Sequence, residues 1–135
     1  MSADADRRTE RRFPSPFIEH LGIRFVSVGS DAAELELEIR PEFLNSVGVV
    51  HGGVYASLAD TGLGAAIYGR LPPDRFAVTA EMSCRYLQGA REGTLRCRSR
   101  VLHLGRTTAV AESEVFLGDA LQFKASGTFM VMARP

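Results

Sequence analysis

One long apolar segment near the middle of the chain limits what the chain can fold into. From His51 to Tyr68 the sequence is dominated by alanine and aliphatic residues and contains no proline. The segment is too long for a typical strand, so it predicts a helix, which Gly69 and the prolines that follow it close. Because this helix is apolar on almost every side, we expect it to be buried, with the rest of the chain folded around it.

The flanking segments are mostly strand-like. Ser15 and Pro16 are typical of a helix start and Gly22 of a helix end, so a short helix precedes the first strand. Predicted strands cover residues 23–28, 34–40, 76–87, 95–104, 107–117 and 121–132. Short turns join neighbouring strands, which favours an antiparallel sheet packed on the long helix, an α+β fold.

Composition and charge narrow the class of protein. The 135 residues fit one domain, and sixteen basic residues balance sixteen acidic ones, so bulk charge favours neither nucleic acid nor a membrane as a partner. No apolar run reaches the length of a membrane span. The charged residues 1–12 predict a disordered tail rather than a secretory signal, and residues 13–135 form the domain. Cys84 and Cys97 are too few for a metal cluster or a disulfide framework, so we expect a cytoplasmic protein.

A single carboxylate interrupts the buried helix. Asp60 lies near its middle, and an unpaired buried carboxylate is costly. It shares one helix face with three small residues at helical spacing, Gly53, Ser57 and Gly64. Two interpretations fit this face: a polar cleft that a ligand enters, or a tight helix contact in which Asp60 bonds to backbone or serine.

The start of the helix carries a second candidate site. His51, Gly52 and Gly53 precede the first apolar turn. The first N–H groups of a helix have no internal acceptor and lie at the positive end of its dipole. Glycines let a ligand reach these groups, which can then stabilise the oxyanion formed when a carbonyl is attacked. Alternatively, the glycines only allow the chain to turn a corner.

These two features cannot act together on one helix. Gly53 and Asp60 lie about 10 Å apart along the axis, whereas a reacting carbon must sit about 3 Å from both the attacking group and the oxyanion donors. Two antiparallel helices from two subunits can satisfy this demand. If both residues act on one substrate, the sequence predicts at least a homodimer, with two shared sites.

The same residues resemble the signature of a known family. The string Asn45-Ser46-Val47-Gly48-Val49-Val50-His51-Gly52-Gly53, followed by Ser57-Leu58-Ala59-Asp60-Thr61, resembles that of hotdog-fold acyl-CoA thioesterases. The closest type is the phenylacetate-degradation (PaaI-type) thioesterase. The resemblance covers roughly residues 17–132, and the order of elements agrees with the one predicted above.

The resemblance implies a fold, a reaction and an assembly. The hotdog fold is an antiparallel six-stranded sheet wrapped around one long central helix. The reaction is the hydrolysis of an acyl-CoA thioester to free CoA and a carboxylic acid. Because a thioester is already activated, no metal is required, and no cofactor is expected because coenzyme A is part of the substrate. The family forms homodimers with shared active sites, usually paired into homotetramers.

The resemblance also implies roles for five residues. Asp60 matches the catalytic carboxylate, acting as nucleophile or as general base on water. Gly53 matches the residue whose N–H polarises the thioester carbonyl. Asn45 and His51 match polar residues near the thioester, and Thr79 falls where relatives carry a serine or threonine that orients the water or the carboxylate.

Other polar residues leave alternatives open. His51 could be an acid/base catalyst, but beside two glycines we favour a supporting role for it. Arg96, Arg98 and Arg100 line one strand face, which is either a solvated outer face or a clamp for the phosphates of coenzyme A. Arg106, at the start of a strand, is the best single candidate for a phosphate contact. A thiol nucleophile at Cys84 is not favoured, because no histidine pattern nearby would activate it.

Two other functions are weighed against thioester hydrolysis. An acyl-thioester hydratase or dehydratase shares the fold, but it typically pairs a histidine base with an acid in a different motif that this sequence lacks. A non-catalytic acyl-CoA-binding protein gains little from a buried carboxylate such as Asp60. The sequence does not identify the acyl group.

Overall fold

The computed structural model describes residues 15–30 and 32–135, and the predicted tail over residues 1–12 lies outside this part. The elements of the described residues are α2 (Pro16–Leu21), β1 (Arg24–Val28), β2 (Ala32–Glu38), η1 (Pro41–Phe43), α3 (Gly52–Tyr68), β3 (Arg75–Tyr86), β4 (Thr94–Leu104), β5 (Thr108–Leu117) and β6 (Ala120–Ala133). The short helix, the long helix and all six strands are confirmed. Among the described residues, the 3-10 turn η1 is the one element without a predicted counterpart.

Local signals set the helix boundaries as expected. The Ser15 hydroxyl accepts a hydrogen bond from the N–H of Ile18 at 3.3 Å, which caps α2. Gly22 ends α2 with a φ of 74°, a left-handed conformation that glycine adopts without strain. His51 is the N-cap of α3, and Gly69 follows its last turn.

The six strands form one fully antiparallel sheet in the order β1-β2-β4-β5-β6-β3. The chain passes from β2 through α3 to β3, which pairs with the last strand, β6. In the described part of the chain, β1 and β3 are therefore the two edge strands. The twelve-residue β3 presents a long edge with no partner strand in this protomer.

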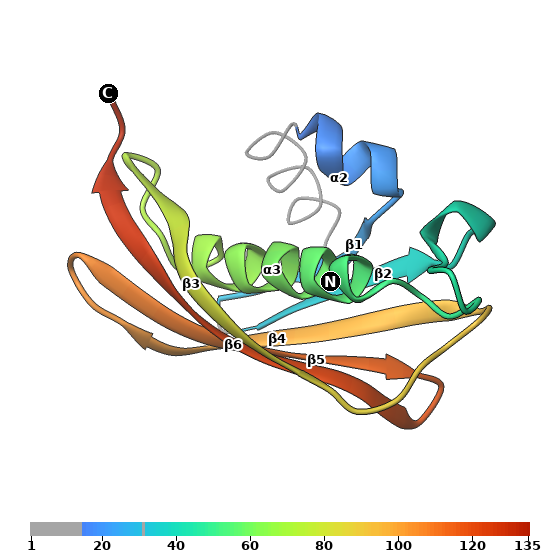
Figure 1. Cartoon of the computed structure of the whole chain (residues 1–135). Helices are drawn as coiled ribbons and strands as arrows, with labels where there is room; N and C mark the ends of the chain where they lie inside the picture. Colours follow the sequence, from blue (N-terminus) through green and yellow to red (C-terminus); the bar gives the residue numbers. More distant parts are fainter. Residues whose placement is uncertain (1–14, 31) are drawn as a thin grey trace.

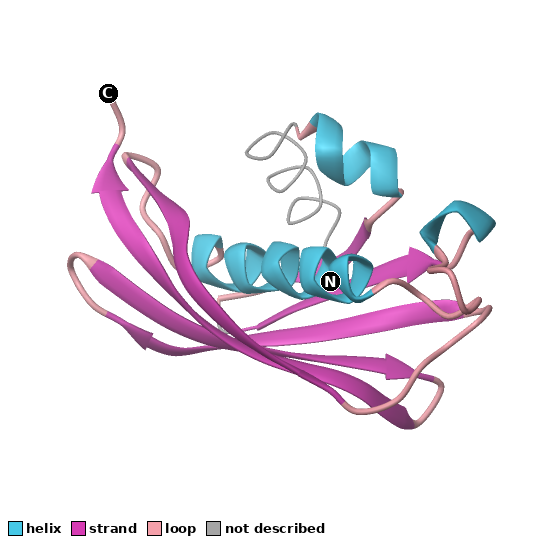
Figure 2. Cartoon of the chain, in the orientation of Figure 1, coloured by secondary structure: helices cyan, strands magenta, loops and turns pink. Residues whose placement is uncertain are grey.

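The sheet curves around α3, which lies along its concave face, and α2 lies on the other side of α3 (Figures 1 and 2). Leu58, Ala59, Leu63 and Ile67 are fully buried between α3 and the sheet. No helix of the described ranges combines the length and apolar character needed to cross a membrane.

One expectation about α3 is wrong. The helix is buried against the sheet but not on every side, because Ser57, Asp60, Thr61 and Gly64 are only half-buried. These residues face away from the sheet core, toward the space between α3 and α2, where they line a pocket. The polar helix face predicted from the spacing of Asp60 is thus the open face of α3.

Candidate active site

Asp60 and Thr79 form the polar centre of this pocket. The Thr79 hydroxyl on β3 donates a hydrogen bond of 2.7 Å to Oδ1 of Asp60 on α3. Thr79 faces the helix because it pairs with the buried Phe129 of β6, and side chains opposite each other share one face of a sheet. The pairing shifts between Thr79 and Glu81, so Thr79 is the last residue of β3 before a bulge. Asp60 is therefore bonded to a side-chain hydroxyl rather than to backbone or serine.

The pocket around Asp60 has a volume of about 490 Å³ and is lined by residues of α2, β1, α3, β3 and β6. Its walls away from the carboxylate are mostly apolar, and they include Phe17, Phe25, Tyr68 and Phe129. A carboxylate beside aromatic and aliphatic side chains is suited to act on a ligand that has one polar and one apolar part.

The charge of Asp60 also acts on Cys84. Burial raises the pKa of the Cys84 thiol, and the negative charge of Asp60 raises this pKa further. The thiol is therefore held protonated at neutral pH, and only the thiolate is a strong nucleophile. This agrees with the expectation that Cys84 is not the attacking group.

The start of α3 forms a second group of polar residues. His51 caps the helix through Nδ1, which accepts the N–H of Gly53 at 2.8 Å. Because Nδ1 accepts, the neutral ring carries its proton on Nε2, which can donate to a ligand. The Gly53 N–H is consequently engaged within this chain, which the sequence could not show. His51 thus caps α3 in this chain, and its supporting role in the reaction stays a prediction.

The Asn45 side chain makes hydrogen bonds within its own loop. Its Oδ1 accepts the N–H groups of Val47 and Val49 at 3.0 and 3.2 Å. These bonds hold the turn that leads to His51, whose N–H donates to the carbonyl of Phe43 at 2.8 Å. The acceptor end of the Asn45 amide is thus used locally, and its Nδ2 group is the end that remains for a ligand.

Two further residues support this loop and were missed by the sequence analysis. Nη1 of Arg91 donates to the carbonyl oxygen of Gly48 at 2.9 Å. The hydroxyl of Tyr86 donates to the carbonyl oxygen of Gly52 at 3.1 Å. Both contacts join residues more than thirty positions apart, so no local pattern could have revealed them.

One chain keeps the two groups of residues apart. Asp60 and Thr79 line the pocket described above, whereas His51 and Gly53 line a separate one of about 360 Å³ under α2 and η1. The two pockets share only Phe17 and Ser57 among their lining residues. That Asp60 and the start of its own α3 do not meet on one substrate stays a prediction.

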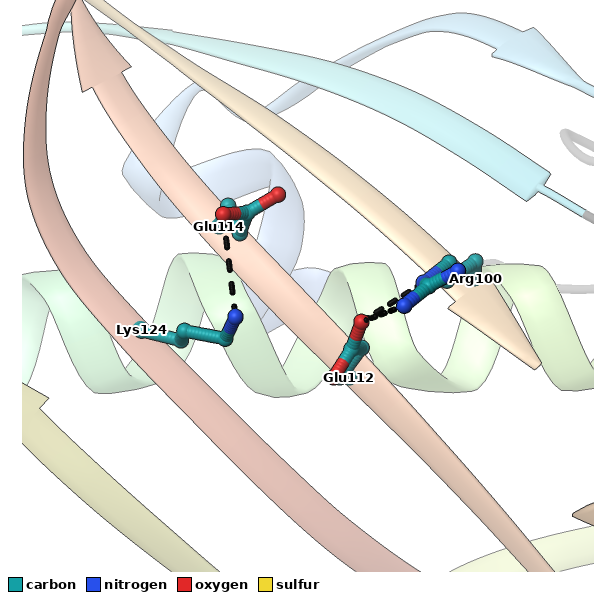
Figure 3. Close-up of polar contacts among 4 residues, drawn as sticks. All are labelled: Arg100, Glu112, Glu114 and Lys124. Atoms are coloured by element: carbon teal, nitrogen blue, oxygen red, sulfur yellow. Dashed lines mark hydrogen bonds and ion pairs between the residues drawn. The ribbon is translucent and has the colours of Figure 1, made fainter. Parts of the chain in front are cut away.

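The strand arginines lie on the other face of the sheet. Arg100 forms an ion pair with Glu112, and Lys124 lies 3.8 Å from Glu114 in a second pair. Figure 3 shows these side chains in front of the strands, with α3 behind the sheet. Arg96 likewise lies 3.6 Å from Glu34 of the neighbouring strand. This pairing favours a solvated outer face over a phosphate clamp.

Arg106 lies in the turn between β4 and β5. Leu104, at the end of β4, packs in the same cluster as Ile67 and Leu71 near the C-terminal end of α3. Arg106 is therefore at the end of the sheet opposite to the start of α3 (Figure 1). Within residues 15–30 and 32–135, no group of three histidine, cysteine or acidic side chains is placed to hold a metal ion.

An antiparallel six-stranded sheet wrapped around one central helix is the hotdog fold, and in this chain the open face of the helix carries a carboxylate. Residues 47–123 match the model of the thioesterase superfamily, and the chain belongs to this superfamily. The activity that characterises the family is thioester hydrolysis, as its name states.

Individual relatives are consistent with this assignment. The 1,4-dihydroxy-2-naphthoyl-CoA hydrolase of Escherichia coli is 30% identical over 96 residues, which are 71% of this chain and 71% of that protein. A solved structure of a mutant of the phenylacetic acid degradation protein PaaI of Thermus thermophilus is 28% identical, with a TM-score of 0.80, and covers 86% of this chain and 98% of that one. A curated protein of Mycobacterium tuberculosis is 44% identical over 46 residues, so the match spans 34% of this chain and only 33% of that protein.

Proposed function

We propose that this protein hydrolyses an acyl-CoA thioester to free CoA and a carboxylic acid. The observation that carries the proposal is the Thr79–Asp60 hydrogen bond of 2.7 Å in the wall of a pocket that aromatic and aliphatic side chains also line. Thr79 occupies Oδ1, so Oδ2 remains to attack the thioester carbon or to take a proton from water. The name of the E. coli relative, a hydrolase of a CoA thioester, supports the same substrate class.

The amides at the start of α3 would polarise the thioester carbonyl. The Gly53 N–H has no acceptor within the helix ladder and is held instead by His51 Nδ1. Binding of the carbonyl oxygen would replace or share this bond, while Nε2–H of His51 offers a further donor. In this scheme His51 supports the site, and the side-chain amide Nδ2 of Asn45 faces the thioester.

A dimer would bring the two groups together. The edge of β3 has free backbone groups along a strand that also carries Thr79, and such an edge is a template for pairing with another chain. Two-fold pairing of β3 edges would place two α3 helices side by side and antiparallel, the start of one near Asp60 of the other. The homotetramer and the cytoplasmic location stay predictions.

Arg106 remains the proposed contact to the coenzyme A phosphates. The substitution Arg106→Ala should raise KM for an acyl-CoA by about tenfold, because one charged hydrogen-bonded contact is lost, with kcat little changed. The matched substrate is the same acyl group on N-acetylcysteamine, which carries no phosphate and whose KM should not move. An equal rise for both substrates would contradict the phosphate contact.

Thiol release from a panel of acyl-CoA substrates tests the proposed function, with wild type and Asp60→Asn measured in parallel. Wild type should release thiol, and Asp60→Asn should lose about 10²–10⁴-fold in kcat with an unchanged melting temperature. A hydratase would consume substrate without free thiol. A binding protein would bind acyl-CoA without turnover. Full activity of Asp60→Asn would remove Asp60 from the mechanism.

A further inference from the structure

The pocket beside Asp60 has an unexplained feature in its wall. Gly64 lies one turn beyond Asp60 on the open face of α3, where it lines the pocket together with Phe17, Tyr68 and Phe129. Glycine is a poorer helix former than alanine, so glycine inside a helix calls for a reason. Three reasons are available: a left-handed backbone, a close neighbour, or space that a ligand needs.

The backbone does not require glycine at this position. Among the described residues, the glycines with positive φ are Gly22, Gly48, Gly93 and Gly118, all outside α3. Gly64 therefore has ordinary helical geometry, which alanine would adopt without strain.

Packing within this protomer does not require glycine either, and a close neighbour on the partner's α3 would make Gly64→Ala lower the melting temperature. A Cβ at Gly64 would have Phe129 as its nearest neighbour, at 3.6 and 4.0 Å from two ring atoms, which is ordinary van der Waals contact. Gly62, two residues earlier, is the opposite case: a Cβ there would lie 2.8 Å from Cys97 Sγ and closer still to Ser99 Oγ. Close contact with the sheet explains Gly62 and leaves Gly64 unexplained.

We propose that Gly64 is a specificity-determining residue, whose missing side chain leaves room for the apolar acyl group of the substrate. This inference rests on the proposed function, because it places the thioester carbon at Asp60. The acyl group would then extend over Gly64 toward Tyr68, which lie about 6 Å and 12 Å beyond Asp60 along the helix axis. The aromatic walls formed by Phe17, Phe25 and Phe129 suit a ring or a chain of several carbons, rather than an acetyl group.

The test compares substrates that differ only in acyl size. Thiol release is measured for wild type, Gly64→Ala and Gly64→Leu with acetyl-, octanoyl- and benzoyl-CoA. For Gly64→Leu, kcat/KM should fall by about tenfold or more on octanoyl- and benzoyl-CoA and by less than about threefold on acetyl-CoA, with Gly64→Ala intermediate. An equal fall on all three substrates, or no fall on any, would overturn the proposal.

Stability supplies the matched control. Gly62→Ala makes the same chemical change in the same helix, but its methyl group meets the sheet. Gly64→Ala should raise the melting temperature by roughly 2–5 °C through better helix propensity, whereas Gly62→Ala should lower it. If Gly64→Ala also lowered the melting temperature, packing would explain Gly64 and the proposal would fail.

A binding measurement separates this inference from the proposed function. Calorimetry with the non-hydrolysable thioethers S-ethyl-CoA and S-octyl-CoA reports on the pocket without catalysis. Gly64→Leu should weaken binding of S-octyl-CoA by about tenfold while leaving S-ethyl-CoA within about threefold. If Gly64→Leu weakened S-octyl-CoA binding as expected but wild type released no thiol, only the proposed function would fail. If Gly64→Leu bound S-octyl-CoA as wild type does, or wild type bound neither ligand, the acyl pocket itself would be refuted.

Discussion

At the scale of single residues, the Thr79 hydroxyl fixes the orientation of the Asp60 carboxylate. Its hydrogen bond of 2.7 Å holds Oδ1 in place. Thr79→Val keeps the shape of the side chain but loses the donor, so we expect kcat in thiol release to fall about tenfold with KM little changed. Thr79→Ser should restore most of the rate. Equal rates for the valine and serine variants would show that the hydroxyl does not position Asp60.

His51 permits a sharp distinction between support and acid/base catalysis. Asparagine is among the best N-cap residues, so His51→Asn keeps an acceptor for the start of α3 but removes the imidazole. For a supporting residue we expect a melting temperature within a few degrees of wild type and a loss in kcat of no more than about tenfold. A loss above about a hundredfold in a folded variant, measured by thiol release and circular dichroism, would make the imidazole a catalyst.

The residues that line the pocket could be predicted from the sequence better than the hydrogen bonds that their polar groups make. The spacing of Asp60 on its helix face allowed a cleft or a tight helix contact, and the structure has a pocket there. The sequence could not show that His51 holds the Gly53 N–H or that Asn45 Oδ1 holds its own loop. Both depend on side-chain orientations that the spacing of residues does not determine. Arg91 remained hidden because its acceptors lie more than forty residues away.

At the scale of elements, boundaries were predictable but the strand order was not. Alternation and turn residues define each strand locally, so all six were predicted. The place of β3 at the far edge, beside β6, depends on the passage of α3 across the sheet and on pairs such as Thr79–Phe129, fifty residues apart. This pairing also brings Thr79 to Asp60, so their contact could not be predicted without the strand order of the sheet.

A buried polar network fixes α3 on the sheet. The Ser113 hydroxyl of β5 donates to the carbonyl of Ala59 at 2.9 Å, and the hydroxyls of Ser113 and Ser99 lie 2.6 Å apart. Cys97 Sγ follows at 3.4 Å from Ser99. Because Ala59 precedes Asp60, this network holds the helix at the position where it bears the carboxylate.

Cys97, which belongs to this network, should make the free energy of unfolding fall at alkaline pH. Burial raises the pKa of Cys97 from 9.0 to about 11, and the hydroxyls of Ser99 and Ser113 only partly oppose this. Between these values the unfolded chain loses the thiol proton while the folded chain keeps it, so stability is full below about pH 9 and falls as pH rises. The expected loss in the free energy of unfolding is roughly 2–3 kcal/mol by about pH 11.

Urea unfolding at pH 8, 9, 10 and 11 checks this dependence, with Cys97→Ala as the control. Cys84, Tyr55 and Tyr86, whose pKa values burial also raises, titrate in both proteins and cancel in the comparison. Wild type should lose more stability than Cys97→Ala over this range. Parallel curves for the two proteins would show that Cys97 is not protected from ionisation.

At the scale of the whole molecule, the unpaired edge of β3 and the two separate pockets point to the same assembly. One protomer holds Asp60 with Thr79 in one pocket and Gly53 with His51 in another. A two-fold axis at the β3 edge would give each site the carboxylate of one chain and the helix start of its partner. Such a symmetry would explain why a single chain carries both proposed halves of the site in separate pockets.

Heterodimers purified through two different tags test this assembly. One chain carries Asp60→Asn and the other Gly53→Pro, which removes the N–H at a position in the first helical turn where proline is tolerated. With shared sites, each heterodimer has one intact site and one site with both changes, so thiol release should recover to about half of the wild-type rate per dimer. The control pairs wild type with a chain carrying both substitutions: shared sites would then both be damaged and the dimer inactive. If this control kept half the activity while the first heterodimer had none, each site would be built from a single chain.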